Sequence, residues 1–178
     1  MTVSDLNFIL ALGTVAMQIG TAVVLLAYLF PQSVPNAQDI LAATKRWGMQ
    51  KIFALSLASA LMTLIYSDVL GFEPCPLCWW QRIFLYPQVF ILGMAWSKEK
   101  YHEAAIDISL IFSILGAAVA LYHHVLQMMP AGTLPCPATG PSCAQITFIE
   151  FGYVTFPMMA LALFGLNIAV LLVLRSRA

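Results

Sequence analysis

Long segments without charged side chains limit what this chain can fold into. The first of them, Leu6–Phe30, runs for twenty-five residues without an Asp, Glu, Lys or Arg. A helix rises about 1.5 Å per residue, so this segment can cross a hydrocarbon core of about 30 Å. A cleaved signal peptide is the alternative, but the residues ahead of the segment include Asp5 and no basic side chain. We therefore expect a membrane-spanning helix.

Four more mainly apolar segments follow. The expected second to fifth spans are Ile52–Leu70, Trp79–Ser97, Ala104–Met128 and Phe151–Leu174. Pro31–Lys51 is expected to be a loop with a short interfacial helix, and Lys98–Glu103 a short charged turn. Hydrophobic residues make up 61% of the chain and charged residues 9%, and the mean hydropathy is +0.88. These values exclude an ordinary soluble domain and predict an all-α integral membrane protein.

Basic residues predict the orientation in the membrane. With five spans, seven of the eight Lys and Arg residues fall on one side: Lys45, Arg46, Lys51, Lys98, Lys100, Arg175 and Arg177. The positive-inside rule makes that side cytoplasmic. The N-terminus and all four cysteines then lie on the opposite, oxidising side, where Arg82 is the only basic residue. The formal net charge is zero, which gives no reason to expect a nucleic-acid partner.

A Cys-x-x-Cys motif stands at the entrance to the third expected span. Pro74 and Pro76 cannot supply the hydrogen bonds of a helix interior, so we expect the helix to begin at or near Cys78. Free N–H groups at a helix N-terminus favour a thiolate, which lowers the cysteine pKa and creates a nucleophile. Arg82 lies one helical turn later on the same face and adds to this bias. A cation so close to hydrocarbon costs free energy and indicates a functional site.

Four cysteines on an oxidising side allow three interpretations. Two structural disulfides could pin the loops, but closing a Cys-x-x-Cys loop removes little chain entropy. Zinc could be bound by four thiolates, although the spacing from Cys136 to Cys143 is wider than a usual zinc knuckle. Thiol–disulfide exchange between two pairs is the third interpretation and the one we favour, because one pair can reoxidise the other. We therefore predict no metal site.

A relay of two cysteine pairs needs a final electron acceptor. The sequence has no Cys-x-x-Cys-His for haem, no glycine-rich nucleotide fingerprint and no further cysteine for an iron–sulfur cluster. A lipid-soluble quinone is the economical choice. Cys78 would meet it where the helix enters the apolar layer, beside Trp79, Trp80 and Arg82.

These motifs resemble those of a known family. Cys75-Pro76-Leu77-Cys78, followed by Trp79-Trp80-Gln81-Arg82 and Tyr86-Pro87, is similar to the bacterial disulfide bond formation proteins of the DsbB/BdbC type. The resemblance extends to His124-Val125-Leu126-Gln127 with Pro130, and to Phe151-Gly152-Tyr153 and Pro157 after the second cysteine loop. It covers the chain from Lys51 to Leu174.

The resemblance implies a four-helix transmembrane bundle at 52–178. Residues 1–30 would then be one extra N-terminal transmembrane helix, and 31–51 a cytoplasmic loop with the interfacial helix. It also implies a thiol:quinone oxidoreductase of the bacterial plasma membrane, which oxidises an extracytoplasmic, DsbA-like thiol oxidase of thioredoxin fold. The electrons would pass to ubiquinone or menaquinone of the respiratory quinone pool, which supports disulfide formation and folding of exported proteins.

The resemblance also assigns roles to the cysteines. Cys136 would form the mixed disulfide with the partner protein, and Cys143 would pass electrons on to Cys75. Cys78 would then engage the quinone ring.

Three further residues are assigned to the quinone. Arg82 matches the family's arginine at the quinone, where it can stabilise developing negative charge. His124 matches a histidine near the quinone that could donate a hydrogen bond or a proton. Trp79 is a candidate contact, although tryptophans at span ends are usual at membrane interfaces. His123 must point in another direction on the helix, so we expect a surface or interface residue there.

The sequence leaves two other functions open. A vitamin K epoxide reductase-like enzyme uses the same two-pair logic, but normally places its Cys-x-x-Cys late in the bundle. A non-catalytic membrane scaffold with structural disulfides belongs to another class, and its disulfides should resist a small excess of dithiothreitol. For the extra N-terminal helix we expect only a packing or anchoring role.

Overall fold

The computed structural model describes residues 2–130, 135 and 140–176, and this part of the chain is mainly helical. The elements are α1 (Val3–Leu29), α2 (Ala37–Leu64), the π-helical turn η1 (Ile65–Val69), α3 (Pro76–Ser97), the 3-10 turn η2 (Glu99–Tyr101), α4 (His102–Met128) and α5 (Phe156–Arg175). The described residues form no β-strand, only an isolated bridge between Glu150 and Val154. The prediction of an all-α chain is confirmed.

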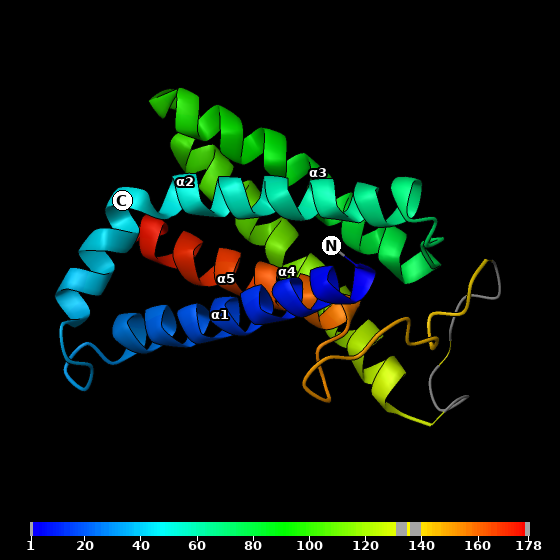
Figure 1. The fold of residues 1–178 in the computed structure, drawn as a ribbon. Helices are drawn as coiled ribbons and strands as arrows, with labels where there is room; N and C mark the ends of the chain where they lie inside the picture. The colour runs from blue at the N-terminus through cyan, green and yellow to red at the C-terminus, as the bar shows by residue number, and fades with distance from the viewer. Residues whose placement is uncertain (1, 131–134, 136–139, 177–178) are drawn as a thin grey trace.

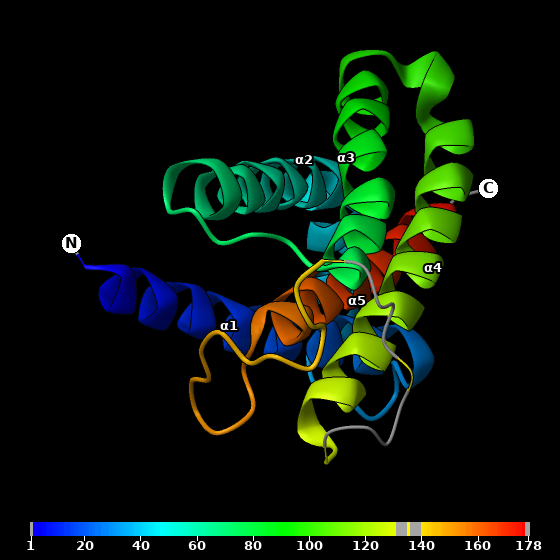
Figure 2. The same ribbon diagram turned by 90° about the vertical axis from the view of Figure 1, so that its right-hand side faces the viewer.

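Helix α5 lies at the centre of the packing. It contacts α1, α2 and α4, while α3 contacts α2 and α4, so that α2, α3, α4 and α5 close a ring. Figure 1 shows α1 running beside α5 at the edge of this ring, and Figure 2 shows α3 and α4 as neighbouring antiparallel helices. The extra N-terminal helix is therefore packed against the ring and is not one of its four members.

Four helical segments of the described chain are long and apolar enough to cross a membrane. They are Val3–Leu29, Ala37–Val69, Glu99–Met128 and Phe156–Arg175. These segments support the prediction of a multi-pass membrane protein. Helix α3 is less apolar, because Gln81 and Arg82 lie in its first half and Pro87 and Gln88 in its middle. That α3, the expected third span, crosses the membrane therefore stays a prediction.

Helices α3 and α5 begin at other residues than expected, for local reasons. Helix α3 begins at Pro76 and not at Cys78, because proline lacks only an N–H group that the first turn of a helix leaves unpaired anyway. Helix α5 begins at Phe156 and not at Phe151. Phe151 and Gly152 have positive φ angles of 52° and 77°, which form a turn and delay the helix.

The expected interfacial helix and second span form one element. Helix α2 begins at Ala37 and continues without a break to Leu64. Figure 1 shows its first turns pointing in a different direction from the rest of the helix. In this region Gly48 lies so close to α5 that a Cβ atom would be 2.8 Å from Val170 Cγ1. Glycine thus permits the close approach of α2 to α5.

A buried hydrogen-bond network joins the four helices of the ring. Ser113 Oγ of α4 donates to Gln88 Oε1 of α3 at 3.0 Å. Asn167 Nδ2 of α5 donates to the same oxygen at 3.3 Å and lies 3.2 Å from Ser56 Oγ of α2. All four side chains are 0% exposed. Interhelical hydrogen bonds inside membranes contribute about 0.6 kcal/mol each on average, and buried polar groups need their partners, so the network specifies which helix faces meet.

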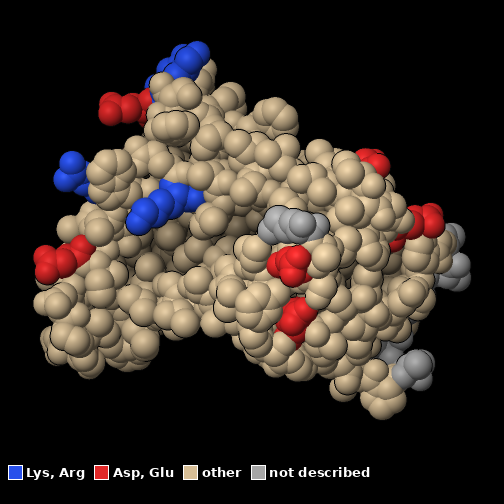
Figure 3. All heavy atoms as spheres, in the orientation of Figure 1, with Lys and Arg blue, Asp and Glu red and all other residues tan. Residues whose placement is uncertain are grey.

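Charged residues gather towards the ends of the molecule. On the face drawn in Figure 3, all Lys and Arg side chains lie in one half of the molecule. This is the half in which α3 ends, α4 begins and α5 ends. The other end, where α3 begins, shows only Asp and Glu on this face. This separation is what the positive-inside prediction requires, although the side of the membrane stays a prediction. Arg177, which that prediction also used, lies outside the described residues.

Candidate functional site

The loop before α3 brings both cysteines of the Cys-x-x-Cys motif to a helix N-terminus. Gly71 has a φ of 74°, and the Phe72 amide donates to the Tyr66 carbonyl at 2.9 Å, which turns the chain after η1. Cys75 is the N-cap of α3, and its Sγ accepts a hydrogen bond from the Cys78 amide at 3.3 Å. The two thiols are free, with their Sγ atoms 2.8 Å apart. A disulfide has an S–S distance of about 2.05 Å, so small side-chain movements can close one.

The second cysteine loop folds over this pair. Cys143 is 1% exposed and belongs to one apolar cluster with Cys75, Leu77 and Leu126. Cys78 packs against the same cluster. Sulfur atoms from both cysteine loops therefore lie at one end of the bundle, as a relay between two pairs requires.

Helix α4 holds the second loop in place through side chains. Tyr122 OH donates to the Pro135 carbonyl at 2.6 Å, and Gln127 Nε2 donates to the Gln145 carbonyl at 3.2 Å. Cys136, the predicted contact with a partner protein, lies outside the described residues. Its role stays a prediction.

His123 of α4 joins the two cysteine loops. Its side chain is 1% exposed, and its Nε2 lies 3.8 Å from Cys75 Sγ and 3.1 Å from the Cys143 carbonyl oxygen. Gln81 Nε2 lies 3.0 Å from Nδ1. An amide NH2 group can only donate, so Nδ1 accepts and Nε2 carries the proton. The expectation of a surface or interface residue at His123 is wrong, because α4 turns this side chain towards the cysteines.

These contacts give the two thiols of the motif opposite pKa shifts. Both thiols lie ahead of the predicted third span, which begins at Trp79. The hydrogen bond with Cys78, and then burial, raise the pKa of Cys75 to about 12, and His123 offsets only part of this. The hydrogen bond from Cys75 is also the largest cause that lowers the pKa of Cys78. Arg82 lowers it further by a smaller amount. The predicted thiolate at Cys78 is thus favoured, chiefly by its partner thiol.

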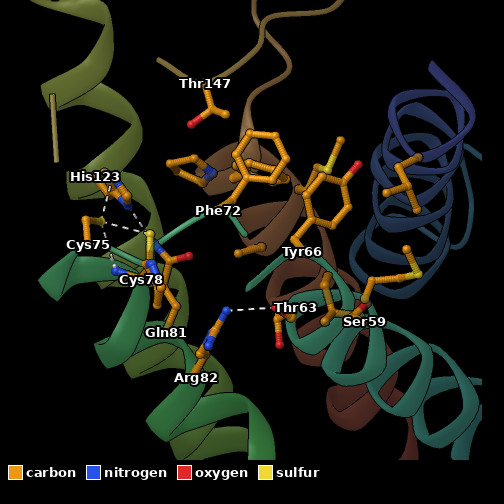
Figure 4. A pocket seen from close by; sticks show the side chains of 18 of the residues that line it. Ser59, Thr63, Tyr66, Phe72, Cys75, Cys78, Gln81, Arg82, His123 and Thr147 are labelled. Carbon is orange, nitrogen blue, oxygen red and sulfur yellow. Dashed lines mark hydrogen bonds between the residues drawn. The ribbon is translucent and has the colours of Figure 1, made fainter. Parts of the chain in front are cut away.

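A cavity of about 780 Å³ extends from the cysteines between the helices. Proteins hold small ligands in cavities of about 300–1,000 Å³. One wall carries the three described cysteines with Gln81, Arg82 and His123, while α1, α2 and α5 supply other walls with mainly apolar side chains. Figure 4 shows Arg82 directed towards Thr63, with Ser59 and Tyr66 across the cavity from the cysteines.

Arg82 is a buried cation at the cavity wall. The residue is 8% exposed, and its Nη2 donates to the Thr63 carbonyl at 2.8 Å. Its Cζ lies 5.1 Å from the centre of the Trp79 ring. Within the described part of the chain Arg82 forms no ion pair. Its charge is thus available to a negative or electron-rich group in the cavity.

Two predicted quinone contacts do not line the cavity. His124 is 9% exposed, and its Nδ1 lies 3.4 Å from Thr155 Oγ1. Trp79 is 52% exposed, and its ring lies against the Arg82 guanidinium. The structure therefore brings Arg82 and the described cysteines together, while contacts of His124 and Trp79 with a quinone stay predictions.

The donor atoms of the site match two kinds of ligand. Apolar walls beside a buried guanidinium and thiols fit a quinone, whose oxygens accept hydrogen bonds and whose ring and tail are apolar. The Sγ atoms of Cys75 and Cys78 and a ring nitrogen of His123 also lie within 4.8 Å of one another, which is suitable for a soft metal ion. This set of two thiols and one imidazole differs from the four thiolates that the sequence suggested for zinc.

Sequence reasoning missed the contribution of α4 to the cysteine cluster. His123 and Gln127 are four residues apart and both line the cavity. This spacing places them on one face of α4 with the buried Ala120, which lies one turn earlier. That shared face was the available signal that both side chains point into the bundle. The contribution of α1 to the cavity had no such signal.

Comparison with known proteins gives one family. The model of the family described as disulfide bond formation protein DsbB matches residues 45–174. This range contains most of α2, all of α3, α4 and most of α5, and leaves out α1. No solved structure matches the chain.

Individual relatives have the same description. The SPbeta prophage-derived disulfide bond formation protein B of Bacillus subtilis is 34% identical over 128 residues, which cover 71% of this chain and 85% of the relative. Disulfide bond formation protein C of Bacillus subtilis is 34% identical over 131 residues, covering 70% and 89%. A probable disulfide formation protein of Chlamydia pneumoniae is 36% identical over 127 residues, covering 70% and 88%.

Proposed function

This chain belongs to the DsbB family of disulfide bond formation proteins, and from that premise we propose that it is a thiol:quinone oxidoreductase. It oxidises the dithiol of an extracytoplasmic, thioredoxin-fold thiol oxidase and passes the two electrons to ubiquinone or menaquinone. The overall reaction turns a dithiol and a quinone into a disulfide and a quinol, so atoms and electrons balance. The oxidised partner then supplies disulfides to exported proteins.

One observation carries this proposal. Cys75, Cys78 and Cys143 meet at the wall of a cavity that also contains the buried Arg82. A pair of structural disulfides would need no such cavity and no cation beside it. A quinone supplies a two-electron, two-proton acceptor when it is bound there.

The cysteines exchange disulfides in a fixed order. A thiolate of the partner attacks the Cys136–Cys143 disulfide, and the second partner thiol releases the oxidised partner. Cys143 then attacks Cys75 of the Cys75–Cys78 disulfide, and Cys78 leaves as a thiolate. Cys136 attacks Cys143 in turn, which restores the first disulfide and releases Cys75. The reduced Cys75–Cys78 pair loses two electrons and two protons to the acceptor and closes again.

His123 supports the release of Cys75. A thiol with a pKa of about 12 forms a poor leaving group, because its thiolate is strongly basic. His123 Nε2 carries a proton 3.8 Å from Cys75 Sγ, where it stabilises or protonates the departing thiolate. Gln81 holds this tautomer through Nδ1.

Arg82 acts on the acceptor side of the site. Its Nη2 is fixed by the Thr63 carbonyl, and its remaining N–H groups can bind the oxygen on which negative charge develops. The same cation stabilises the Cys78 thiolate one helical turn earlier. Arg82 therefore stabilises negative charge both on the Cys78 sulfur and on the oxygen of the acceptor.

We also propose the arrangement in the membrane. Helix α3 crosses the membrane as the expected third span, its N-terminal turn lies at the extracytoplasmic surface, and the basic end of the bundle faces the cytoplasm. Labelling with a membrane-impermeant maleimide tests this orientation. Reduced Cys78, whose pKa is lowered, should be labelled in intact spheroplasts, and a cysteine introduced at Lys98 only after lysis. The reverse pattern would overturn the orientation.

A coupled assay tests the reaction. Purified protein is mixed with a reduced thioredoxin-fold oxidase and a soluble quinone, and quinone absorbance is followed. We expect one quinone reduced per partner disulfide in the wild type and no turnover for Cys78→Ser. Arg82→Ala should need more quinone for half-maximal rate, whereas Arg175→Ala at the other end of the bundle should match the wild type. Equal rates for wild type and Cys78→Ser would refute the function, and a chelator that abolishes activity would favour the metal interpretation.

A further inference from the structure

Helix α1 contributes a wall to the cavity, although it lies outside the family match. The matched range begins at residue 45, after α1 has ended. Five residues of α1 nevertheless line the cavity: Ile9, Leu10, Gly13, Thr14 and Met17. Their spacing of one, three or four residues is that of one helix face. This contribution goes beyond the packing or anchoring role that the sequence predicts for the extra helix.

Side-chain contacts fix this stretch of α1 at both ends. Tyr66 OH of η1 donates to Asn7 Oδ1, and both residues are buried. Tyr153 OH, in the turn before α5, donates to Gln18 Oε1 at 2.8 Å. The cavity-lining residues 9–17 lie between these two hydrogen bonds. The position of the wall relative to α2 and α5 is thus specified by the fold.

The α1 wall offers no polar group to a ligand. The Thr14 hydroxyl donates to the Leu10 carbonyl at 2.9 Å within the helix. The other four lining residues of α1 are apolar or glycine. The Arg82 cation and the cysteine thiols lie on the opposite side of the cavity. A ligand with a polar head and an apolar tail would therefore place its head at Arg82 and its tail towards α1.

Small, accessible residues lie where α1 and α2 border the cavity. Gly13 of α1 and Ala58 of α2 are both exposed and both line the cavity. A Cβ atom at Gly13 would meet no atom within 4 Å. Both residues lie within candidate membrane-spanning helices, so the cavity lining is accessible from outside in segments expected to be surrounded by lipid.

We propose that the polyprenyl tail of the quinone leaves the cavity between α1 and α2, over Gly13 and Ala58. Helix α1 then forms one side of the substrate site and selects for the tail and not for the ring. This inference rests on the proposed thiol:quinone function. It assigns a binding role to a helix that the family match leaves out.

A larger side chain at Gly13 tests whether the quinone tail leaves the cavity there. Gly13→Leu has space for its Cβ and replaces a poor helix former, so we expect it to fold. It should raise the KM for a polyprenyl quinone by about tenfold, as overpacking a filled site does, and leave the KM for a quinone of the same ring with a short tail within about twofold. Ala16→Leu adds similar bulk on an exposed part of α1 outside the cavity lining and should change neither KM.

A photolabel provides a readout that does not depend on turnover. A quinone with a diazirine on its tail is irradiated with the wild-type protein, and labelled residues are located by mass spectrometry. We expect labels within residues 9–17 and 55–62, and competition by unlabelled polyprenyl quinone. Labels confined to α3 and α4, or no labels, would overturn the proposed path of the tail. Two kinetic results would do the same: equal KM changes for the long-tailed and the short-tailed quinone, or equal effects of Gly13→Leu and Ala16→Leu. If the wild type reduced neither quinone while the tail label still reached α1, the proposed function would fail and the binding wall would stand.

Discussion

The thiol of Cys75 should be almost unreactive towards alkylation near neutral pH. Its pKa is raised to about 12 by the hydrogen bond with Cys78 and by burial. At pH 8 the thiolate fraction is then about 10⁻⁴, whereas an ordinary cysteine with a pKa of about 8.5 is roughly one quarter thiolate. Since only the thiolate reacts, Cys75 should be alkylated about 10³-fold more slowly than an unperturbed cysteine.

The two pKa shifts predict how the alkylation rate of each thiol depends on pH. Between pH 7 and pH 9 the Cys75 rate should rise about tenfold per unit without levelling off, because this range lies well below a pKa of about 12. Cys78, whose pKa is lowered, should react faster than Cys75 and should level off at lower pH than an ordinary cysteine. Cys78→Ser removes the thiolate that opposes ionisation of Cys75. The Cys75 rate should then rise at least tenfold at pH 8.

The assay is alkylation of the reduced protein with iodoacetamide. Aliquots are quenched over time, and fragment spectra distinguish a label on Cys75 from one on Cys78. The same protein unfolded in guanidinium gives the intrinsic rate of each thiol. Equal rates at the two cysteines, a plateau for Cys75 near pH 8.5, or no acceleration in Cys78→Ser would refute the assignment of the two protonation states.

Three further predictions concern the contacts around the site and in the bundle. His123→Ala should slow partner oxidation about 10²-fold in stopped-flow kinetics, since it removes a proton donor at Cys75, while His102→Ala, at the opposite end of α4, should not. Asn167→Leu should lower the free energy of unfolding in detergent by about 1 kcal/mol, because two interhelical hydrogen bonds disappear; unchanged stability would contradict this. Gly116→Val should cost about 1–3 kcal/mol, because a Cβ there would lie 2.5 Å from a phenylalanine ring of α5, whereas Gly165→Ala, with its nearest contact at 3.8 Å, should cost far less.

The helical architecture could be predicted because its causes are local. A long run of apolar residues must satisfy its own backbone hydrogen bonds in a bilayer, and a helix does so within one segment. The expected end of the third span at Ser97 and of the fourth at Met128 agree with α3 and α4. The predicted start of a helix was wrong where the backbone adopts positive φ angles, as at Phe151 and Gly152 before α5.

The candidate site could be predicted only in part. The Cys-x-x-Cys motif and Arg82 are neighbours in sequence, so their proximity follows from helix geometry. His123 lies forty-eight residues after Cys75 and twenty residues before Cys143. Its burial therefore depends on how the two cysteine loops pack against α4. Adjacent histidines on a helix point in different directions, but their spacing does not say which one faces the site.

The sequence by itself determined a membrane-embedded helical chain with a redox motif at one end, because hydropathy, charge and helix capping act over a few residues. Tertiary structure decided that His123 and Gln81 accompany the cysteines, that His124 turns to Thr155, and that α1 lines the cavity. Those outcomes depend on how five helices pack against one another. Packing is set by the shapes of many side chains at once, which no short stretch of sequence contains.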